Sequence, residues 1–165
     1  PNASGRAVYA DVYDDVALAA LPVAGACLVT ADGAVAMDHD ALEAAHLPLL
    51  VRQTEVALRC LRPGGTLVVK FFEGCTAPTV RWAGWVASHF ETTSVIKPTS
   101  SRPTNSERYL VARHLATTPS LPYEDAVVAP AWCAEFARVA DRLASEQAAA
   151  LQRTLDRVAQ FRAPE

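Results

Sequence analysis

One stretch decides the fold: GGTLVVKFFEG, residues 64–74. After its two glycines it reads as a buried strand that is apolar except for Lys70 near its end. The later stretch KPTSSRPTNSERYLVAR, residues 97–113, places Glu107 just ahead of another apolar strand. Strand ends are where open α/β sheets carry their chemistry. The two stretches therefore predict a functional edge that holds an amine and an acid.

A third stretch, LVTADGA at residues 28–34, ends an earlier strand in a second acid, Asp32. The expected elements, in chain order, are a strand at 26–31, a helix at 40–61, a strand at 66–72, a helix at 79–90, and strands at 92–96 and 108–111. Strands that alternate with helices predict a parallel sheet with right-handed crossovers, and the last two strands can close it as an antiparallel hairpin.

Local signals set the details of the first long helix. Asp40 can cap its start, with Glu43 three residues on as in a capping box. Pro48 is expected either to kink this helix or to mark its first turn. His46 is expected on the helix face, without a role as a ligand.

The composition changes after residue 116, so we divide the chain into a domain at 1–116, a linker at 117–130 and a helical tail at 131–165. The tail repeats apolar residues at three- and four-residue steps, interrupted at Gln147. This pattern predicts one long helix, or two helices with a break near Gln147. The narrow apolar seam either packs on the domain or docks another protein subunit.

Gross composition narrows the class. With 165 residues, 51% of them hydrophobic, and a net charge of −3, the chain is an ordinary globular domain, and any nucleic-acid surface must be a local patch. No apolar run approaches the roughly 20 residues of a membrane span. A start without methionine or signal peptide suggests a piece of a longer polypeptide. The four cysteines lack the spacing of a zinc site, so we predict no metal: Cys27, Cys60, Cys75 and Cys133. They are expected to be reduced thiols, which indicates an intracellular protein. The compartment is left open.

Three motifs in order give the chain a family likeness. LVTADGA, RPGGTLVVKFFEG and KPTSSRPTNSERYLVA resemble the aspartate, lysine and glutamate motifs of the FtsJ-like RNA 2′-O-ribose methyltransferases, which use S-adenosylmethionine. The resemblance implies a Rossmann-like methyltransferase sheet, here its C-terminal part, ending in an antiparallel hairpin and followed by an α-helical extension. It also implies an RNA partner and S-adenosylmethionine as cofactor.

The resemblance also implies a catalytic set. The family's Lys-Asp-Lys-Glu tetrad is carried over by motif as Asp32, Lys70 and Glu107. A ribose 2′-hydroxyl is a poor nucleophile that must be held in line and lose its proton as it attacks. Lys70 is assigned the central role, with the two carboxylates positioning it and neutralising its charge. Each residue alone has an ordinary explanation as a turn cap, a solvated lysine or an edge-strand charge, so the ordered combination carries the assignment.

Binding residues follow from the same motifs. The expected cofactor contacts are Asp11, Asp32, Gly33 and Ala34. Asp11 corresponds to an acid that accepts the adenine amino group, although Asp14 and Asp15 are equally acidic. The expected RNA-binding residues are Lys97, Ser100, Ser101, Arg102 and Arg108, the charged ones through phosphates.

Two parts of the family pattern have no counterpart in this sequence: the glycine-rich turn that holds the methyl donor, and the first lysine of the tetrad. The missing half could belong to the same polypeptide, could come from another subunit, or could have been lost together with catalysis. The favoured function is 2′-O-methylation of ribosomal RNA or of an mRNA cap. The alternative is a catalytically inactive RNA-binding or assembly scaffold of a ribonucleoprotein particle.

Overall fold

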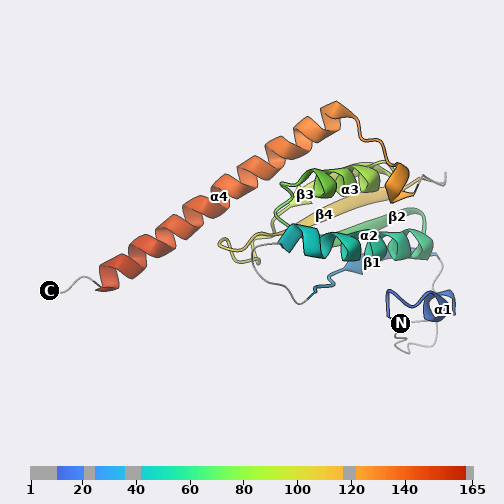
Figure 1. Cartoon of the computed structure of the whole chain (residues 1–165), viewed down its shortest axis with the longest axis horizontal. Coiled ribbons are helices and arrows are strands. Elements are labelled where there is room, and N and C mark those ends of the chain that lie inside the picture. Colours follow the sequence, from blue (N-terminus) through green and yellow to red (C-terminus); the bar gives the residue numbers. More distant parts are fainter. Residues whose placement is uncertain (1–10, 21–24, 36–41, 117–121, 163–165) are drawn as a thin grey trace.

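The computed structural model describes residues 11–20, 25–35, 42–116 and 122–162 (Figure 1). Its elements are α1 (Asp15–Ala19), β1 (Ala26–Ala31), α2 (Leu42–Cys60), β2 (Leu61–Phe72), α3 (Ala77–Ala87), β3 (Phe90–Ile96), β4 (Glu107–Leu115), a 3-10 turn η2 (Tyr123–Asp125) and α4 (Pro130–Arg162). No helix in these ranges is long and apolar enough to cross a membrane.

The described strands form one mixed sheet in the order β1-β2-β4-β3. β1 and β2 run parallel, joined by α2 as a crossover, while β4 lies antiparallel between β2 and β3. The predicted α/β class and the closing antiparallel pair are confirmed. One edge of this sheet gathers the ends of β1, β2 and β3 and the start of β4, because β4 runs in the opposite direction.

β2 begins earlier than the sequence predicted. Residues 62–65, which precede the strand expected at 66–72, lie inside it. The register between β1 and β2 slips there, from Ala26 opposite Leu61 to Leu28 opposite Thr66. Gly64 takes a φ of 76°, which allows the irregularity without strain.

One face of the sheet is covered by α2 and α3 (Figure 1). Leu67, Val69 and Phe71 alternate along β2 toward these helices and are fully buried. Trp82 and Trp85 of α3 pack in the same core. The chain therefore builds its main hydrophobic core on this side.

The other face of the sheet is only half-buried, although the sequence pattern predicted a buried strand here. Lys70 and Phe72 point to this side, and the register sets Lys70 opposite Tyr109 of β4. An alternating strand with one open face leaves room for polar side chains on that face. The candidate site lies there.

The first turn of α2 differs from expectation. Asp40 lies outside the described residues. Glu43 caps another helix: its carboxylate accepts the backbone N–H groups of Gly74, Cys75 and Thr76 ahead of α3. Pro48 lies inside α2, well past its first turn.

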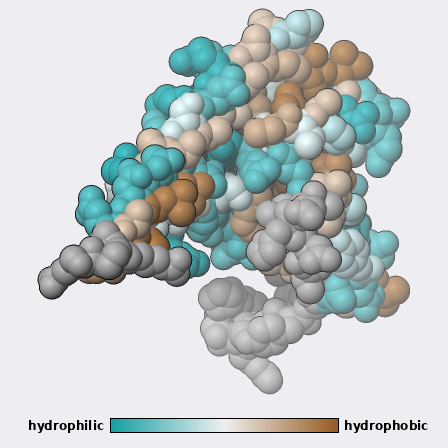
Figure 2. Space-filling model, turned by 60° about the vertical axis from the view of Figure 1, so that its left-hand side comes forward, coloured by the Kyte–Doolittle hydropathy of each residue, from teal (hydrophilic) through white to brown (hydrophobic). Residues whose placement is uncertain are grey.

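α4 is a single helix that passes through Gln147 without a break. Its first half packs on the domain: Phe136 is 5% exposed, and its ring centroid lies 6.3 Å from that of Phe71. The second half projects away from the sheet (Figure 1). Figure 2 shows apolar side chains among hydrophilic ones on this projecting arm, and the exposed apolar residues of α4 there are Leu151, Leu155, Val158 and Phe161.

The four cysteines are free thiols, as predicted. Cys27 and Cys75 are exposed; Cys27 lies on β1, a strand at the edge of the described sheet, and Cys75 lies in the loop after β2.

Candidate active site

Asp32 and Lys70 form an ion pair at the edge where β1 and β2 end. The parallel register sets Ala31 opposite Val69, so the next residues of the two strands meet. The Lys70 side chain is only 12% exposed, whereas that of Asp32 is 68% exposed. The Lys70 ammonium also lies 5.7 Å from the centroid of the Phe72 ring. The cation is thus held below the surface by a carboxylate that reaches solvent.

Glu107 joins this face from β4. It pairs with Phe72 in the antiparallel register, and this pair lies two residues along each strand from the Lys70–Tyr109 pair. Because side chains alternate along a strand, the Glu107 side chain points to the same face as Lys70. Its Oε1 accepts hydrogen bonds from the Tyr109 hydroxyl at 3.0 Å and the Ser101 hydroxyl at 3.1 Å. Burial raises the pKa of Tyr109, and the hydrogen bond to Glu107 adds to the rise. The three residues predicted as catalytic therefore lie at one edge and on one face.

The turn after Asp32 is clamped by two residues of α2 that sequence reasoning did not assign to the site. His46 Nε2 lies 3.0 Å from the Gly33 carbonyl oxygen, and the Gly33 N–H donates to Gln53 Oε1 at 2.8 Å. His46 is 1% exposed, and its ring stacks edge-on against Phe72. His46 and Gln53 are two helical turns apart and share one face of α2, a spacing that is visible in the sequence but does not indicate Gly33 as their target.

Burial lowers the pKa of His46; the hydrogen bond to Gly33 opposes this, and the nearby Lys70 charge lowers the pKa further. The ring is therefore neutral at neutral pH and donates from Nε2 to the carbonyl. Its buried Nδ1 has no hydrogen-bond partner among the described residues. A neutral imidazole beside Lys70 adds no second positive charge to the site.

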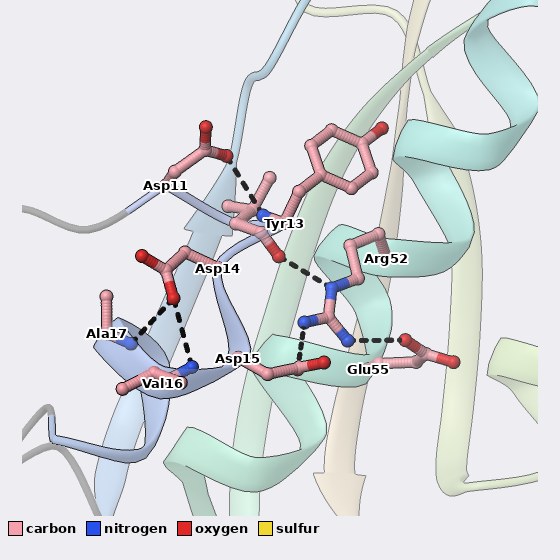
Figure 3. A network of polar contacts seen from close by, with 9 residues as sticks. Asp11, Tyr13, Asp14, Asp15, Val16, Ala17, Arg52 and Glu55 are labelled. Atoms are coloured by element: carbon pink, nitrogen blue, oxygen red, sulfur yellow. Dashed lines mark hydrogen bonds and ion pairs between the residues drawn. The ribbon is translucent and has the colours of Figure 1, made fainter.

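Asp11 lies elsewhere. Its carboxylate accepts the backbone N–H of Tyr13 at 2.9 Å, and Arg52 of α2 holds the adjacent chain through the Val12 carbonyl and an ion pair with Asp15 (Figure 3). The hydrogen bond from Arg52 lowers the pKa of Asp15. Figure 1 shows α1 at the end of the sheet where β1 begins, whereas Asp32 follows β1 at its other end. The structure thus does not bring Asp11 to the Asp32 turn.

Arg108 departs from its predicted role as a phosphate contact. It alternates with Glu107 along β4 and points to the helix-covered face, where it is 2% exposed. Its guanidinium donates to the Glu73 carbonyl, and burial lowers its pKa. A side chain so enclosed has no surface to offer RNA. Its contact instead ties β4 to the loop after β2.

Lys97 is half-buried, and its ammonium is held by oxygen atoms of its own loop. It donates to the carbonyl and side-chain oxygens of Asn105 at 2.9 and 2.6 Å and to the Glu107 carbonyl at 3.0 Å. The structure thus gives the Lys97 ammonium partners within the loop, whereas a phosphate contact was expected. Ser101, which hydrogen-bonds Glu107, also faces inward, whereas Ser100 and Arg102 are exposed on the same loop.

The turn at residues 32–34 offers part of a site for a methyl donor. Gln53 takes the Gly33 N–H, so this donor is not available to a ligand, and the Gly33 carbonyl oxygen already has one contact with His46. The exposed Asp32 carboxylate and the exposed Ala34 remain open at this edge. These residues fit one wall of a cofactor site beside Lys70, and the described residues supply no glycine-rich turn for the rest.

Comparison with known proteins finds a family and relatives for this chain. A family model described as FtsJ-like methyltransferase matches residues 7–115. A cap-specific mRNA (nucleoside-2′-O-)-methyltransferase of Autographa californica nuclear polyhedrosis virus is 37% identical over 116 residues, covering 67% of this chain and 42% of the relative. A cap-specific mRNA (nucleoside-2′-O-)-methyltransferase 1 of Trypanosoma brucei brucei is 38% identical over 88 residues, covering 51% of this chain and 24% of the relative. The chain spans less than half the length of either relative.

A solved structure described as Alphavirus P23pro-zbd is similar at a TM-score of 0.51 and 26% identity, covering 66% of this chain and 19% of that one. The alternative of a catalytically inactive scaffold gains no support, because the relatives that match are named as methyltransferases.

Proposed function

This chain belongs to the FtsJ-like methyltransferase family, and from that premise we propose that its protein transfers a methyl group from S-adenosylmethionine to a ribose 2′-hydroxyl of RNA. The observation that carries the proposal is the placement of Asp32, Lys70 and Glu107 on one face at one edge of the sheet. Three separate sequence motifs converge there, as the chemistry needs.

S-adenosylmethionine, when bound, supplies a methyl group activated by a sulfonium. The ribose 2′-hydroxyl would accept this methyl group and release its proton to solvent, and the donor would leave as a neutral thioether. Lys70 orients the 2′ oxygen and stabilises the negative charge that develops on it. Asp32 holds the Lys70 ammonium in place through their ion pair. Glu107 adds a second negative charge that the described contacts fix on this face.

The exposed loop beside the site suits the nucleic acid. Arg102 and Ser100 are exposed next to the inward-facing Ser101, so they are placed to contact the phosphates that flank the target ribose. We infer a capped mRNA 5′ end as the substrate, because the relatives named above are cap-specific enzymes. Ribosomal RNA is the other substrate to test.

The test uses the full natural polypeptide with S-adenosylmethionine and three RNAs: a capped transcript, the same transcript uncapped, and ribosomal RNA. Digestion to nucleosides and mass spectrometry then report 2′-O-methylation. We expect methylation of the capped transcript, and Lys70→Ala should reduce it by roughly 1000-fold or more. Arg113→Ala, a change at an exposed position farther along β4, is the matched control.

Methylation of a base, or a Lys70→Ala protein that is as active as the parent, would overturn the proposed function. Equal methylation of the capped and uncapped transcripts would overturn only the cap assignment.

A further inference from the structure

The loop between β3 and β4 is closed from inside by one lysine. Lys97 follows the last residue of β3, and Asn105 and Glu107 lie where the chain returns to β4. The Lys97 ammonium bridges the two ends through the three hydrogen bonds given above. Because an ammonium has three protons, these oxygens use its full donor capacity.

The hydrogen bonds of Lys97 are connected to the Glu107 carboxylate through Ser101. The Ser101 hydroxyl lies 3.1 Å from Glu107 Oε1 and 3.3 Å from Asn105 Oδ1, and it has one proton to give. Asn105 Oδ1 already accepts a proton from Lys97 at 2.6 Å. The serine proton is therefore directed to Glu107. The oxygen of the same hydroxyl faces the Lys97 ammonium, with Nζ and Oγ 3.4 Å apart.

Lys97 also holds the backbone of Glu107. Its ammonium donates to the Glu107 carbonyl oxygen, so the backbone that carries this side chain is held in place. Tyr109 and Ser101 then both donate to one carboxylate oxygen, Oε1. On the outer side of the loop, Gln147 of α4 donates to the Thr104 carbonyl at 3.3 Å. The loop is thus held from both sides, and Glu107 has little freedom to rotate.

We propose that Lys97 is a positioning residue that sets the Glu107 carboxylate for methyl transfer, acting through Asn105 and Ser101. The inference rests on the proposed function above, and it replaces the expected contact between Lys97 and RNA. Lys97 reaches neither the RNA nor the methyl donor in this role. Its effect on the reaction passes through Glu107 alone.

The experiment compares Lys97→Met, which keeps the length of the side chain and removes the charge and its protons, with the parent and with Arg113→Met as control. We expect Lys97→Met to lower kcat by roughly 10- to 100-fold, with the Kd for RNA unchanged within about twofold because no phosphate contact is lost. Lys97→Arg should restore part of kcat. Ser101→Ala should lower kcat by a smaller factor.

A double-mutant cycle with Glu107→Gln separates positioning from general damage. If Lys97 acts through Glu107, then Lys97→Met has little further effect on kcat in the Glu107→Gln background. Additive losses, or a loss that falls on the Kd for RNA, would overturn the proposal.

A second measurement does not depend on activity. Three-bond NMR couplings of Glu107 should report one side-chain rotamer in the parent and averaged rotamers in Lys97→Met. If the parent protein transfers no methyl group, the proposed function is rejected. The couplings would then still test whether Lys97 positions Glu107. A single unchanged rotamer in Lys97→Met would contradict it.

Discussion

Glu43 and Thr76 are joined by two hydrogen bonds: Glu43 Oε2 accepts both the backbone N–H and the side-chain hydroxyl of Thr76. The other carboxylate oxygen accepts the N–H groups of Gly74 and Cys75. The first turn of α2 therefore satisfies the start of α3, which would otherwise leave unpaired donors. This contact fixes the loop after β2 and, with it, the end of the strand that carries Lys70.

Removal of this carboxylate should destabilise the fold. Glu43→Ala removes the acceptor of three backbone N–H groups, of which that of Gly74 is buried, so we expect a loss of about 2–4 kcal/mol in the free energy of unfolding. Glu43→Gln keeps one acceptor oxygen and should lose less. Urea denaturation measures both, with Glu146→Ala on the exposed face of α4 as the control. Equal stability of Glu43→Ala and the parent would contradict the capping role.

The same carboxylate should make the fold sensitive to acid. Burial raises the pKa of Glu43, but the hydrogen bonds from Thr76 and Cys75 outweigh it, so the pKa in the folded protein lies below the ordinary value of 4.5. A lowered carboxyl pKa contributes stability that is present above the unfolded pKa and is lost as the pH falls through the folded one. We expect the free energy of unfolding to fall below about pH 4.5, and less steeply in Glu43→Gln. Parallel curves for the two proteins would argue against it.

Two buried histidines should act at higher pH. Burial lowers the pKa of His46 and of His89 below their ordinary 6.5, against the opposing hydrogen bonds to Gly33 and Trp85. Between the ordinary and lowered values the unfolded chain binds more protons, so the free energy of unfolding should decrease as the pH falls below 6.5. His46→Gln should flatten part of this slope and the double variant with His89→Gln more of it. Urea titrations at pH 7.5 and 5.5 measure the difference, and a parent equally stable at both would contradict the prediction.

Gly84→Ala tests the packing of α3. Alanine favours a helix over glycine by about 1 kcal/mol, but a Cβ at this position would lie 2.6 Å from Val128 Cγ2. Overpacking costs about 1–3 kcal/mol, so we expect a net loss in the free energy of unfolding. Val128→Ala should rescue part of it, because the smaller side chain leaves room for the new methyl group. A Gly84→Ala protein more stable than the parent would show that the Val128 segment can move away.

Gly33→Ala tests the clamp beside Asp32. A Cβ there would lie 2.7 Å from Gln53 Oε1 and 3.1 Å from Leu49 Cδ2, so the turn must shift. We expect kcat for methyl transfer to fall by roughly 10- to 100-fold, since Asp32 would no longer meet Lys70 in the same geometry. Kinetics at saturating RNA measure this effect, with Ala44→Gly on the exposed side of α2 as the control. Unchanged kcat would mean that the position of Asp32 does not depend on this turn.

The site was predictable where one motif marks one strand end. Asp32, Lys70 and Glu107 each stand at a strand terminus that the apolar pattern reveals, and the sheet brings those termini to one edge. The clamps were not predictable, because they join distant segments. His46 and Gln53 reach back from α2 to Gly33, and nothing local in the helix indicates that target.

The sequence by itself determined the order of helices and strands, the α/β class and the motif residues, because hydrophobic periodicity and turn chemistry act over short distances. Only the tertiary structure decided where each charge points. Glu107 and Arg108 are neighbours in the chain, yet alternation along β4 sends one to the open face and buries the other. Lys97 was equally ambiguous as a sequence feature, since a basic residue before a polar loop suits a phosphate as well as an internal contact. The fold placed three oxygen acceptors around its ammonium and so gave it an internal role.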